Sequence, residues 1–285
     1  MRGDHGFGAV RTAARLTAFM TRVAVALAVL LAPACGATGP DSVAGKGTLV
    51  VGVRPDLPGL GLRLPDGTFE GFDVDVAAYL AAKLGAKVRY VAVLAADREA
   101  VLLDGRADLV LATYSITQER KKRVSFAGPY HVSYQDIMVR SGQKGIGNVR
   151  DLAGRRICAV AGSNAAERVV EERGVAAELV PATDYDQCLA LLKDGALDAI
   201  TTNDVILAGL AHRAGGGLRL VNARFNEQRT GVGIRKGDLD GCEALNRAIT
   251  DLYQDGTAAR LLHKWFDGTG LDLTSIHIPR FEGCE

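Results

Sequence analysis

Residues 114–130, YSITQERKKRVSFAGPY, and the strand before them decide the interpretation of this chain. Polar side chains follow the apolar run 109–112, which is typical of a buried strand. They are Thr113, Ser115, Thr117 and Arg120. The carboxyl edge of an open α/β sheet is where ligands bind, and an arginine there offers a planar fork of donors that fits a carboxylate. Composition alone favours the alternative, a strand-to-helix loop with a solvated basic run at 120–123.

Apolar strands alternate with helices along the rest of the chain. The expected strands are 48–53, 88–93, 109–113, 156–161, 199–202, 218–221 and 231–234, and the expected helices are 72–84, 98–104, 165–173, 185–193, 204–212, 239–255 and 258–266. Such alternation is typical of parallel sheets built from βαβ units, and residues 137–140 are expected to begin a connection. The pattern restarts near residue 140, which predicts two lobes.

Three separated motifs resemble those of bacterial extracellular solute-binding proteins of family 3, the polar amino-acid receptors of ABC importers. The motifs are GTLVVGVRPDLPGLGLRLPDGTFEGFDVDVAAYLAAKLG (47–85), T-x-S-I-T-x-x-R with V-x-F-A-G-P-Y (113–130) and DGALDAITTNDVILAGLA (194–211). The likeness covers about residues 47–266. Its PGLGLR segment and cysteine placement are most similar to actinobacterial glutamate-binding lipoproteins.

The resemblance implies the type II periplasmic-binding-protein fold, with two α/β lobes, each a mostly parallel sheet flanked by helices. Lobe 2 would be inserted into lobe 1, with hinge crossings near Val139-Arg140 and Gly231–Gly233. The expected divisions are a signal peptide (1–34), a tether (35–46), lobe 1 (47–139 plus 233–268), lobe 2 (140–232) and a tail (269–285) with Cys284 as its expected anchor.

The amino terminus has the features of an export signal. Arginines precede a short apolar run, Val23–Leu31, which is too short to span a bilayer. Cys35 follows small residues, as a lipid attachment site does, although Ala32–Ala34 equally fits cleavage for soluble secretion. We expect an extracytoplasmic protein, anchored to the outer face of the cell membrane by lipid or else secreted.

The chain contains five cysteines. If Cys35 carries lipid, four remain, and an even number in an exported chain predicts disulfides. Of the three possible pairings we favour Cys158 with Cys188, because both fall in the middle third, and Cys242 with Cys284. Buried free thiols are the alternative.

Charge excludes some partners. Residues 1–34 hold four Arg and one Asp, so their removal changes the formal charge from +1 to about −2. A near-neutral surface gives no reason to expect nucleic-acid binding or strong binding to a membrane surface. About 250 residues remain, enough for one or two domains with sizeable cores.

The resemblance also implies a ligand site. Arg120 would hold the α-carboxylate with Ser115 and Thr113, and Ser163 would add a donor beside the backbone that follows Gly162. Asn164 stands where the family usually has Thr, and Asn203 stands where it has the Asp that binds the α-ammonium. Three readings stay open: Asp204 turns inward, Asn203 binds through its carbonyl oxygen, or Asp204 only caps a helix.

Further candidates concern the ligand's side chain. Arg63, together with Arg54, would bind a side-chain carboxylate and favour glutamate or aspartate over glutamine, unless the two are solvated loop residues. Tyr114 would pack on the ligand's carbons, or belong to the core. Thr230, beside the second hinge, is a weaker candidate for the side-chain end.

No catalytic, metal or cofactor motif is recognisable. The histidines have no ligand spacing; they are His5, His131, His212, His263 and His277. G-x-S-x-G and P-loop motifs are missing. We therefore expect a monomeric receptor without cofactor that captures glutamate (or aspartate or glutamine) and docks on ABC permease subunits.

Two other functions remain possible on the same fold, namely a dehydratase acting on a cyclic carboxylic acid and a sensor domain. An enzyme would need a general acid in the cleft, and Asp56 and Asp204 are better explained as polar contacts.

Overall fold

The structure is a computed structural model that describes residues 3, 42–271, 273 and 276–284. Cys35, with most of the predicted signal peptide and tether, lies outside the described residues. Within the described ranges, no helix is long and apolar enough to cross a membrane.

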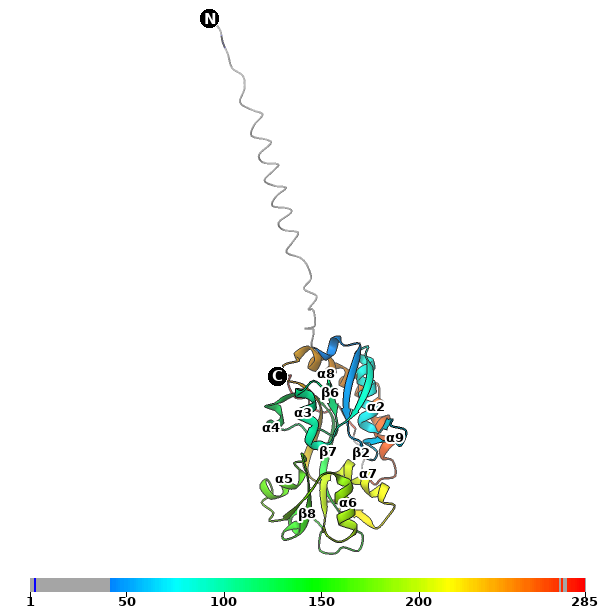
Figure 1. The fold of residues 1–285 in the computed structure, drawn as a ribbon, viewed down its shortest axis with the longest axis vertical. Coiled ribbons are helices and arrows are strands. Elements are labelled where there is room, and N and C mark those ends of the chain that lie inside the picture. The colour runs from blue at the N-terminus through cyan, green and yellow to red at the C-terminus, as the bar shows by residue number, and fades with distance from the viewer. Residues whose placement is uncertain (1–2, 4–41, 272, 274–275, 285) are drawn as a thin grey trace. The chain divides into compact units, whose positions relative to one another are not determined.

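Strands and helices alternate through lobe 1 and lobe 2 (Figure 1). The strands are β1 (Thr48–Val53), β2 (Asp56–Leu57), β3 (Gly61–Arg63), β4 (Phe69–Glu70), β5 (Lys87–Ala92), β6 (Leu109–Leu111), β7 (Val124–Arg140), β8 (Arg156–Val160), β9 (Glu178–Ala182), β10 (Ile200–Asn203), β11 (Leu218–Leu220) and β12 (Phe225–Arg235). The α-helices are α2 (Phe72–Lys83), α3 (Arg98–Leu103), α4 (Gln118–Lys121), α5 (Ala165–Glu171), α6 (Tyr185–Lys193), α7 (Asp204–Ala214), α8 (Leu239–Gln254) and α9 (Thr257–Phe266). Short 3₁₀ turns lie at η2 (Val43–Gly45), η3 (Ala95–Asp97) and η4 (Val149–Leu152).

Parallel pairing forms the first part of each lobe. β1 lies between β5 and β6 and is parallel to both, and β8 is parallel to β9. β1 and β6 are mostly buried and apolar, because helices cover the sheet, with α2, α8 and α9 packed together, whereas β5 at the sheet edge is partly exposed. The carboxyl ends of β1, β5 and β6 therefore meet at one edge, and the loops that follow these strands carry the candidate residues of lobe 1.

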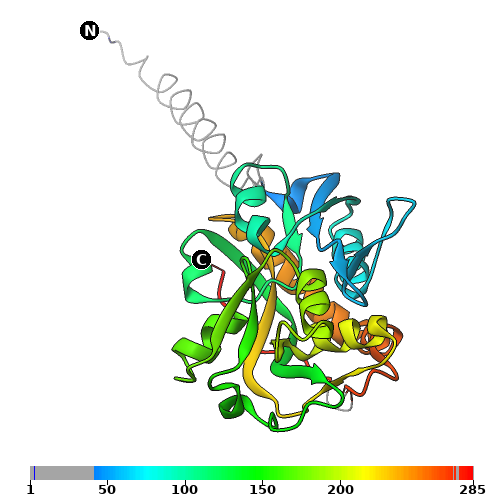
Figure 2. The same ribbon diagram turned by 60° about the horizontal axis from the view of Figure 1, so that its bottom comes forward.

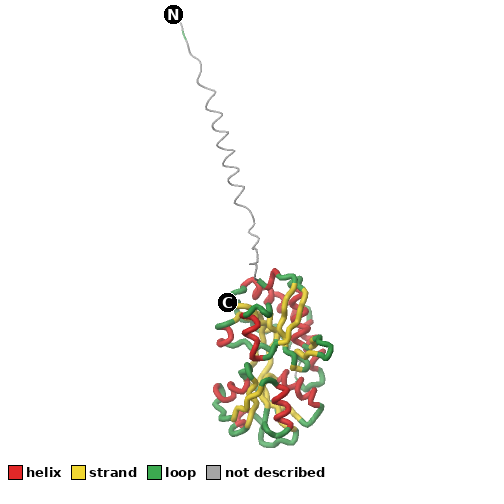
Figure 3. Tube along the Cα trace, in the orientation of Figure 1, coloured by secondary structure: helices red, strands yellow, loops and turns green. Residues whose placement is uncertain are grey.

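Two long antiparallel strands, β7 and β12, connect the lobes (Figures 2 and 3). In Figure 2 the gold β12 lies beside the green β7. Residues 124–127 of β7 pair with 232–235 of β12, next to β6, whereas residues 135–138 pair with β10 in lobe 2. The expected connection at 137–140 is therefore wrong, because these residues form the end of β7.

The pairing bears on where the chain crosses between lobes. We propose that the hinge consists of residues 128–134 and 228–231, between the segments that pair within each lobe. The first crossing would then lie before the expected position at 139–140. Below, lobe 1 means residues 47–127 and 232–268, and lobe 2 means residues 135–227.

Both expected disulfides are present, Cys158–Cys188 and Cys242–Cys284. The first ties β8 to α6 inside lobe 2. The second ties the tail to α8, which confirms the expected anchor at Cys284.

Candidate functional site

Arg120 lies where the two lobes meet. It belongs to the single-turn helix α4, which begins after Thr117, whose hydroxyl accepts the Arg120 N–H at 3.2 Å. Arg120 is 9% exposed, and its guanidinium donates to the carbonyl oxygens of Ser115 (2.7 Å) and Gly162 (2.9 Å). Gly162 follows β8 in lobe 2, so this one side chain contacts both lobes.

A second buried arginine, Arg98, was not among the expected site residues. Its guanidinium donates to backbone carbonyls at the ends of β5 and β6 and, across the lobe boundary, to Gly162 at 2.7 Å. Arg98 and Arg120 both stack on the Tyr114 ring, at 4.6 and 5.0 Å from its centroid. Burial and the charges of Arg120 and Arg54 lower the pKa of Arg98 to about 9, and burial also lowers the pKa of Arg120.

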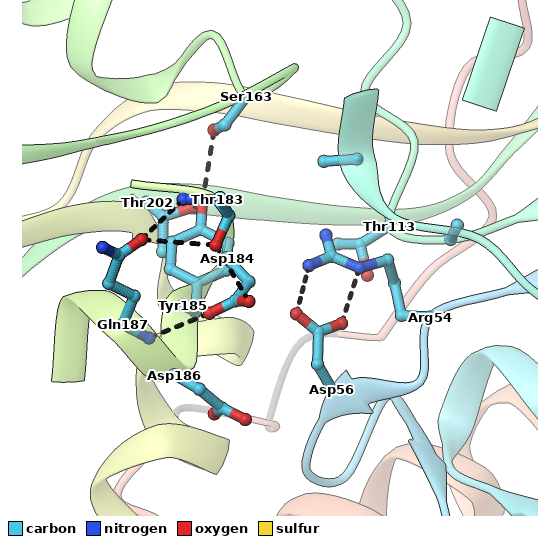
Figure 4. Close-up of polar contacts among 12 residues, drawn as sticks. Arg54, Asp56, Thr113, Ser163, Thr183, Asp184, Tyr185, Asp186, Gln187 and Thr202 are labelled. Carbon is cyan, nitrogen blue, oxygen red and sulfur yellow. Dashed lines mark hydrogen bonds and ion pairs between the residues drawn. The ribbon is translucent and has the colours of Figure 1, made fainter. Parts of the chain in front are cut away.

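The structure separates the two arginines that the sequence grouped as side-chain ligands. Arg54 is 2% exposed and forms a bidentate ion pair with Asp56, at 2.8 and 2.6 Å (Figure 4). Its guanidinium lies 6.0 Å from the Tyr185 ring of lobe 2. Arg63 is exposed and lies over the Phe69 ring. Arg54 therefore belongs to the buried cationic group, whereas Arg63 lies on the surface.

The hydroxyl groups expected in the site, those of Thr113, Ser115 and Thr230, differ in their hydrogen-bond partners. Thr113 adopts a left-handed backbone (φ 47°), and both its N–H and its hydroxyl donate to Asp73. The Ser115 hydroxyl donates to Gln228 at 3.2 Å, and Ser115 pairs with Thr230 in an isolated bridge. The Thr230 hydroxyl oxygen is buried, and among the described residues it has no hydrogen-bond partner. Such an atom needs an explanation, and a polar ligand atom is one.

Lobe 2 contributes neutral groups that lie at or near the ends of β8, β9 and β10. The Ser163 hydroxyl lies 3.2 Å from the Tyr185 hydroxyl, which lies 2.6 Å from the hydroxyl of Thr202 (Figure 4). Asn164 precedes α5, and its side chain makes no capping bond. Tyr185 opens α6 just beyond the end of β9, a position that the same sheet-edge rule would have selected, but the sequence interpretation missed it.

Asn203 and Asp204 follow β10 but contact different groups. Asn203 donates to the Ser133 hydroxyl at 3.2 Å. The Asp204 carboxylate is paired with Arg224 (3.0 Å) and accepts the Val205 N–H (2.8 Å). Burial raises the pKa of Asp204 to about 6, although Arg224 opposes the shift.

Asp204 also lines a cavity of about 310 Å³ with side chains from the hinge, α9 and the tail. Arg120, Ser115 and Thr113 are not among the residues that line this cavity. The geometry therefore does not bring Asp204 together with the arginines.

Two glycines allow the lobes to touch. A Cβ on Gly162 would lie 2.5 Å from the backbone of Ala95 and Ala96, and a Cβ on Gly209 would lie 2.1 Å from the carbonyl oxygen of Pro58. Real Cβ contacts are not this short, so the backbones of the two lobes are in direct contact at both points. The buried arginines lie at the first of them.

The donors gathered here suit an organic anion. Within the described part of the chain, no group of three or more His, Cys, Asp and Glu side chains is arranged to hold a metal ion. Arg98 was missed because an arginine at the start of a helix usually extends into solvent. Gln228 was missed because nothing in its local sequence distinguishes it.

Comparisons with known proteins agree on the family. The model of the bacterial extracellular solute-binding proteins, family 3, matches residues 49–268. The glutamate-binding protein GluB of Corynebacterium glutamicum is 35% identical over 272 residues, which cover 89% of this chain and 91% of that protein.

Solved structures agree as well. An ancestral arginine-binding protein bound to arginine is similar with a TM-score of 0.72 and 29% identity, covering 78% of this chain and 99% of that chain. The ancestral amino acid-binding protein AncCDT-1, a precursor of cyclohexadienyl dehydratase, has a TM-score of 0.70 and 28% identity, covering 78% and 96%. The chain belongs to the bacterial extracellular solute-binding proteins of family 3.

Proposed function

We propose that this protein is the receptor of an amino-acid ABC importer and that its ligand is an acidic amino acid, glutamate first. One observation carries the ligand class. Three buried guanidinium groups, of Arg54, Arg98 and Arg120, lie close enough that the charges of the other two lower the pKa of Arg98. Asp56 pairs with Arg54, whereas within the described residues Arg98 and Arg120 donate to backbone carbonyls and form no ion pair. A buried excess charge is costly, and a ligand with two carboxylates would offset it.

The α-carboxylate would be held by Arg120 and the Ser115 hydroxyl. Both groups lie at the carboxyl edge of β6, and Arg120 already reaches the lobe 2 backbone at Gly162. The Thr230 hydroxyl, buried beside Ser115, would bond a polar ligand atom. Thr113 would act indirectly, by fixing the turn through Asp73.

The ligand's side-chain carboxylate would be attracted by the positive charges of Arg54 and Arg98. The Tyr114 ring would pack on the ligand's carbons. Arg54 replaces Arg63 in this proposal, because Arg63 is exposed. From lobe 2, Ser163 and the backbone at Asn164 would add donors.

The α-ammonium needs an acceptor in lobe 2. We assign it to the carbonyl oxygen of Asn203 rather than to Asp204, because the Asp204 carboxylate is already paired with Arg224. Closure of the lobes would bury both charged ends of the ligand. This burial is energetically favourable only if protein groups bind each charged end.

Calorimetric titration of the mature protein with L-glutamate, L-aspartate, L-glutamine and L-arginine tests the ligand class. We expect L-glutamate to bind most tightly, L-glutamine at least about tenfold more weakly because one buried charge is unmatched, and L-arginine not to bind. Tighter binding of L-arginine than of L-glutamate would refute the acidic ligand, and no binding of any of the four would refute the amino-acid receptor.

We also propose that the protein is exported, is monomeric and is anchored to the membrane through lipid on Cys35. Mass spectrometry of the mature amino terminus checks the anchor, and an unmodified or absent Cys35 would mean secretion instead.

The enzymatic alternative rests on the similarity to AncCDT-1. Incubation with a cyclohexadienyl carboxylic acid, followed by an assay for the dehydrated product, would reveal a dehydratase.

A further inference from the structure

The carboxyl-terminal tail has more anchors than its disulfide. Cys284 is bonded to Cys242 of α8, and two residues earlier the Glu282 N–H donates to the Gly128 carbonyl at 2.8 Å. Gly128 belongs to the first hinge strand. The Asn246 side chain accepts the Gly128 N–H at 2.7 Å, so α8, the tail and this hinge strand are joined at one place.

The Glu282 carboxylate connects two further segments. One oxygen is bonded to Lys121 at 3.3 Å, and the other is bonded to Arg229. The three side chains are only 12–30% exposed. Partly buried charges interact more strongly than surface pairs, because water screens them less. The carboxylate is therefore an acceptor that Lys121 and Arg229 share.

Both cations belong to segments that carry the proposed ligand residues. Lys121 is the neighbour of Arg120 on α4, a helix of one turn that is not stable by itself and depends on its contacts. Arg229 is the neighbour of Thr230 on the second hinge strand, and its carbonyl accepts the Ile116 N–H at 2.8 Å. Glu282 thereby links α4 to the hinge.

We infer that Glu282 is a positioning residue, which acts through Lys121 and Arg229 to hold the Arg120 helix against the hinge, with the Cys242–Cys284 disulfide keeping the tail in place. The inference rests on the proposed function in one respect, namely that the ligand contacts Arg120. A tail fixed on α8 thus sets the position of the guanidinium that the ligand meets.

The test replaces Glu282 with Gln, which keeps the shape and removes the charge. In the ligand-free protein we expect faster amide exchange confined to residues 117–123 and 228–231. The dissociation constant for L-glutamate should rise about tenfold, the size of an ordinary coupling between contacting groups. Glu243→Gln, an exposed carboxylate on α8 in the same lobe, is the matched control and should change neither measurement.

Two further variants separate positioning from general stability. If Glu282 acts through Lys121, the double variant Lys121→Gln/Glu282→Gln should lose less affinity than the sum of the two single losses. Cys242→Ser/Cys284→Ser should reproduce the local exchange pattern of Glu282→Gln. A merely structural role would instead quicken exchange throughout lobe 1, α2 included, and leave the dissociation constant unchanged.

The outcomes distinguish this inference from the proposed function. If the wild-type protein binds L-glutamate and Glu282→Gln binds it equally well, the inference is overturned and the receptor stands. If the wild-type protein binds no amino acid, the receptor fails. Exchange then decides alone: faster exchange confined to the two segments supports the link, and unchanged exchange overturns it.

Discussion

The lobe 1 edge and the lobe 2 edge meet at Gly162 but present different chemistry. Lobe 1 supplies buried charge through Arg54, Arg98 and Arg120, held by backbone carbonyls and Asp56. Lobe 2 supplies the Gly162 carbonyl, hydroxyls and an amide. Of its described carboxylates, two are buried and both have partners: Asp204 is paired with Arg224, and Asp136 accepts the backbone N–H groups of Ile137 and Ala223. We therefore propose that lobe 1 determines which ligand charge is accepted, whereas lobe 2 determines whether the lobes can close.

The largest effect should come from lobe 1. Replacing Arg120 with Ala should reduce the affinity for L-glutamate by more than about a hundredfold, because removing one partner of a desolvated charge pair costs about 3–5 kcal/mol. Calorimetric titration measures the loss. Arg123→Ala, in the same basic run but 60% exposed and paired with Glu99, is the control and should stay within about twofold. Similar affinities in the two variants would remove Arg120 from the site.

The lobe 1 half of the site could largely be predicted from the sequence. Arg120, Ser115 and Thr113 lie within eight residues of one another and follow a single strand, so their spacing fixes their position at the sheet edge. Arg54, which the sequence interpretation grouped with Arg63, and Arg98, which it missed, lie outside that motif along the chain. Their burial follows from the packing of three neighbouring strand ends, which no local pattern records.

The second largest effect on affinity should come from a substitution that prevents the two lobes from closing on the ligand. Gly209 lies inside α7 with ordinary helical geometry, so Ala should favour the isolated helix by about 1 kcal/mol. In the structure, where the two lobes touch, however, the added Cβ would lie 2.1 Å from the Pro58 carbonyl oxygen. We expect Gly209→Ala to keep or raise the thermal midpoint without ligand and to weaken L-glutamate binding by at least about tenfold, since closure is blocked.

A glycine in open space serves as the control for this substitution. Gly142 lies in an exposed turn of lobe 2 with nothing within 4 Å of an added Cβ, so Gly142→Ala should change affinity little. Unchanged affinity in Gly209→Ala would mean that ligand binding does not require the contact with Pro58, and the division of roles between the lobes would fail.

The lobe 2 half could not be predicted as well, for two physical reasons. Gly128-Pro129 interrupts the apolar pattern of β7, so the sequence indicated no strand there. The strand nevertheless continues past it, beside a register shift in β12 between Thr230 and Val232. The second reason is that neighbouring side chains at a strand end point to opposite sides, so a one-residue uncertainty left the choice between Asn203 and Asp204 open.

The smallest effect on binding, with a clear signature in stability, should come from Asp204. Asp204→Asn should leave the affinity for L-glutamate at pH 7 within about twofold, because the carboxylate is paired with Arg224 outside the arginine group. A loss greater than tenfold would return Asp204 to the ammonium site and make Asn203 the structural residue.

The pH dependence of stability checks the environment of the same group. Burial raises the pKa of Asp204 from 3.8 to about 6, so the folded protein binds this proton more tightly than the unfolded chain does. The free energy of unfolding of the wild type, relative to Asp204→Asn, should therefore fall as the pH rises from about 4 to 6. The full change is about 3 kcal/mol, at about 1.4 kcal/mol per pKa unit, and should level off above pH 7. Urea unfolding at several pH values measures it, and a difference that rises with pH over this range would mean that Arg224 outweighs burial and that the carboxylate is a stabilising anion in lobe 2.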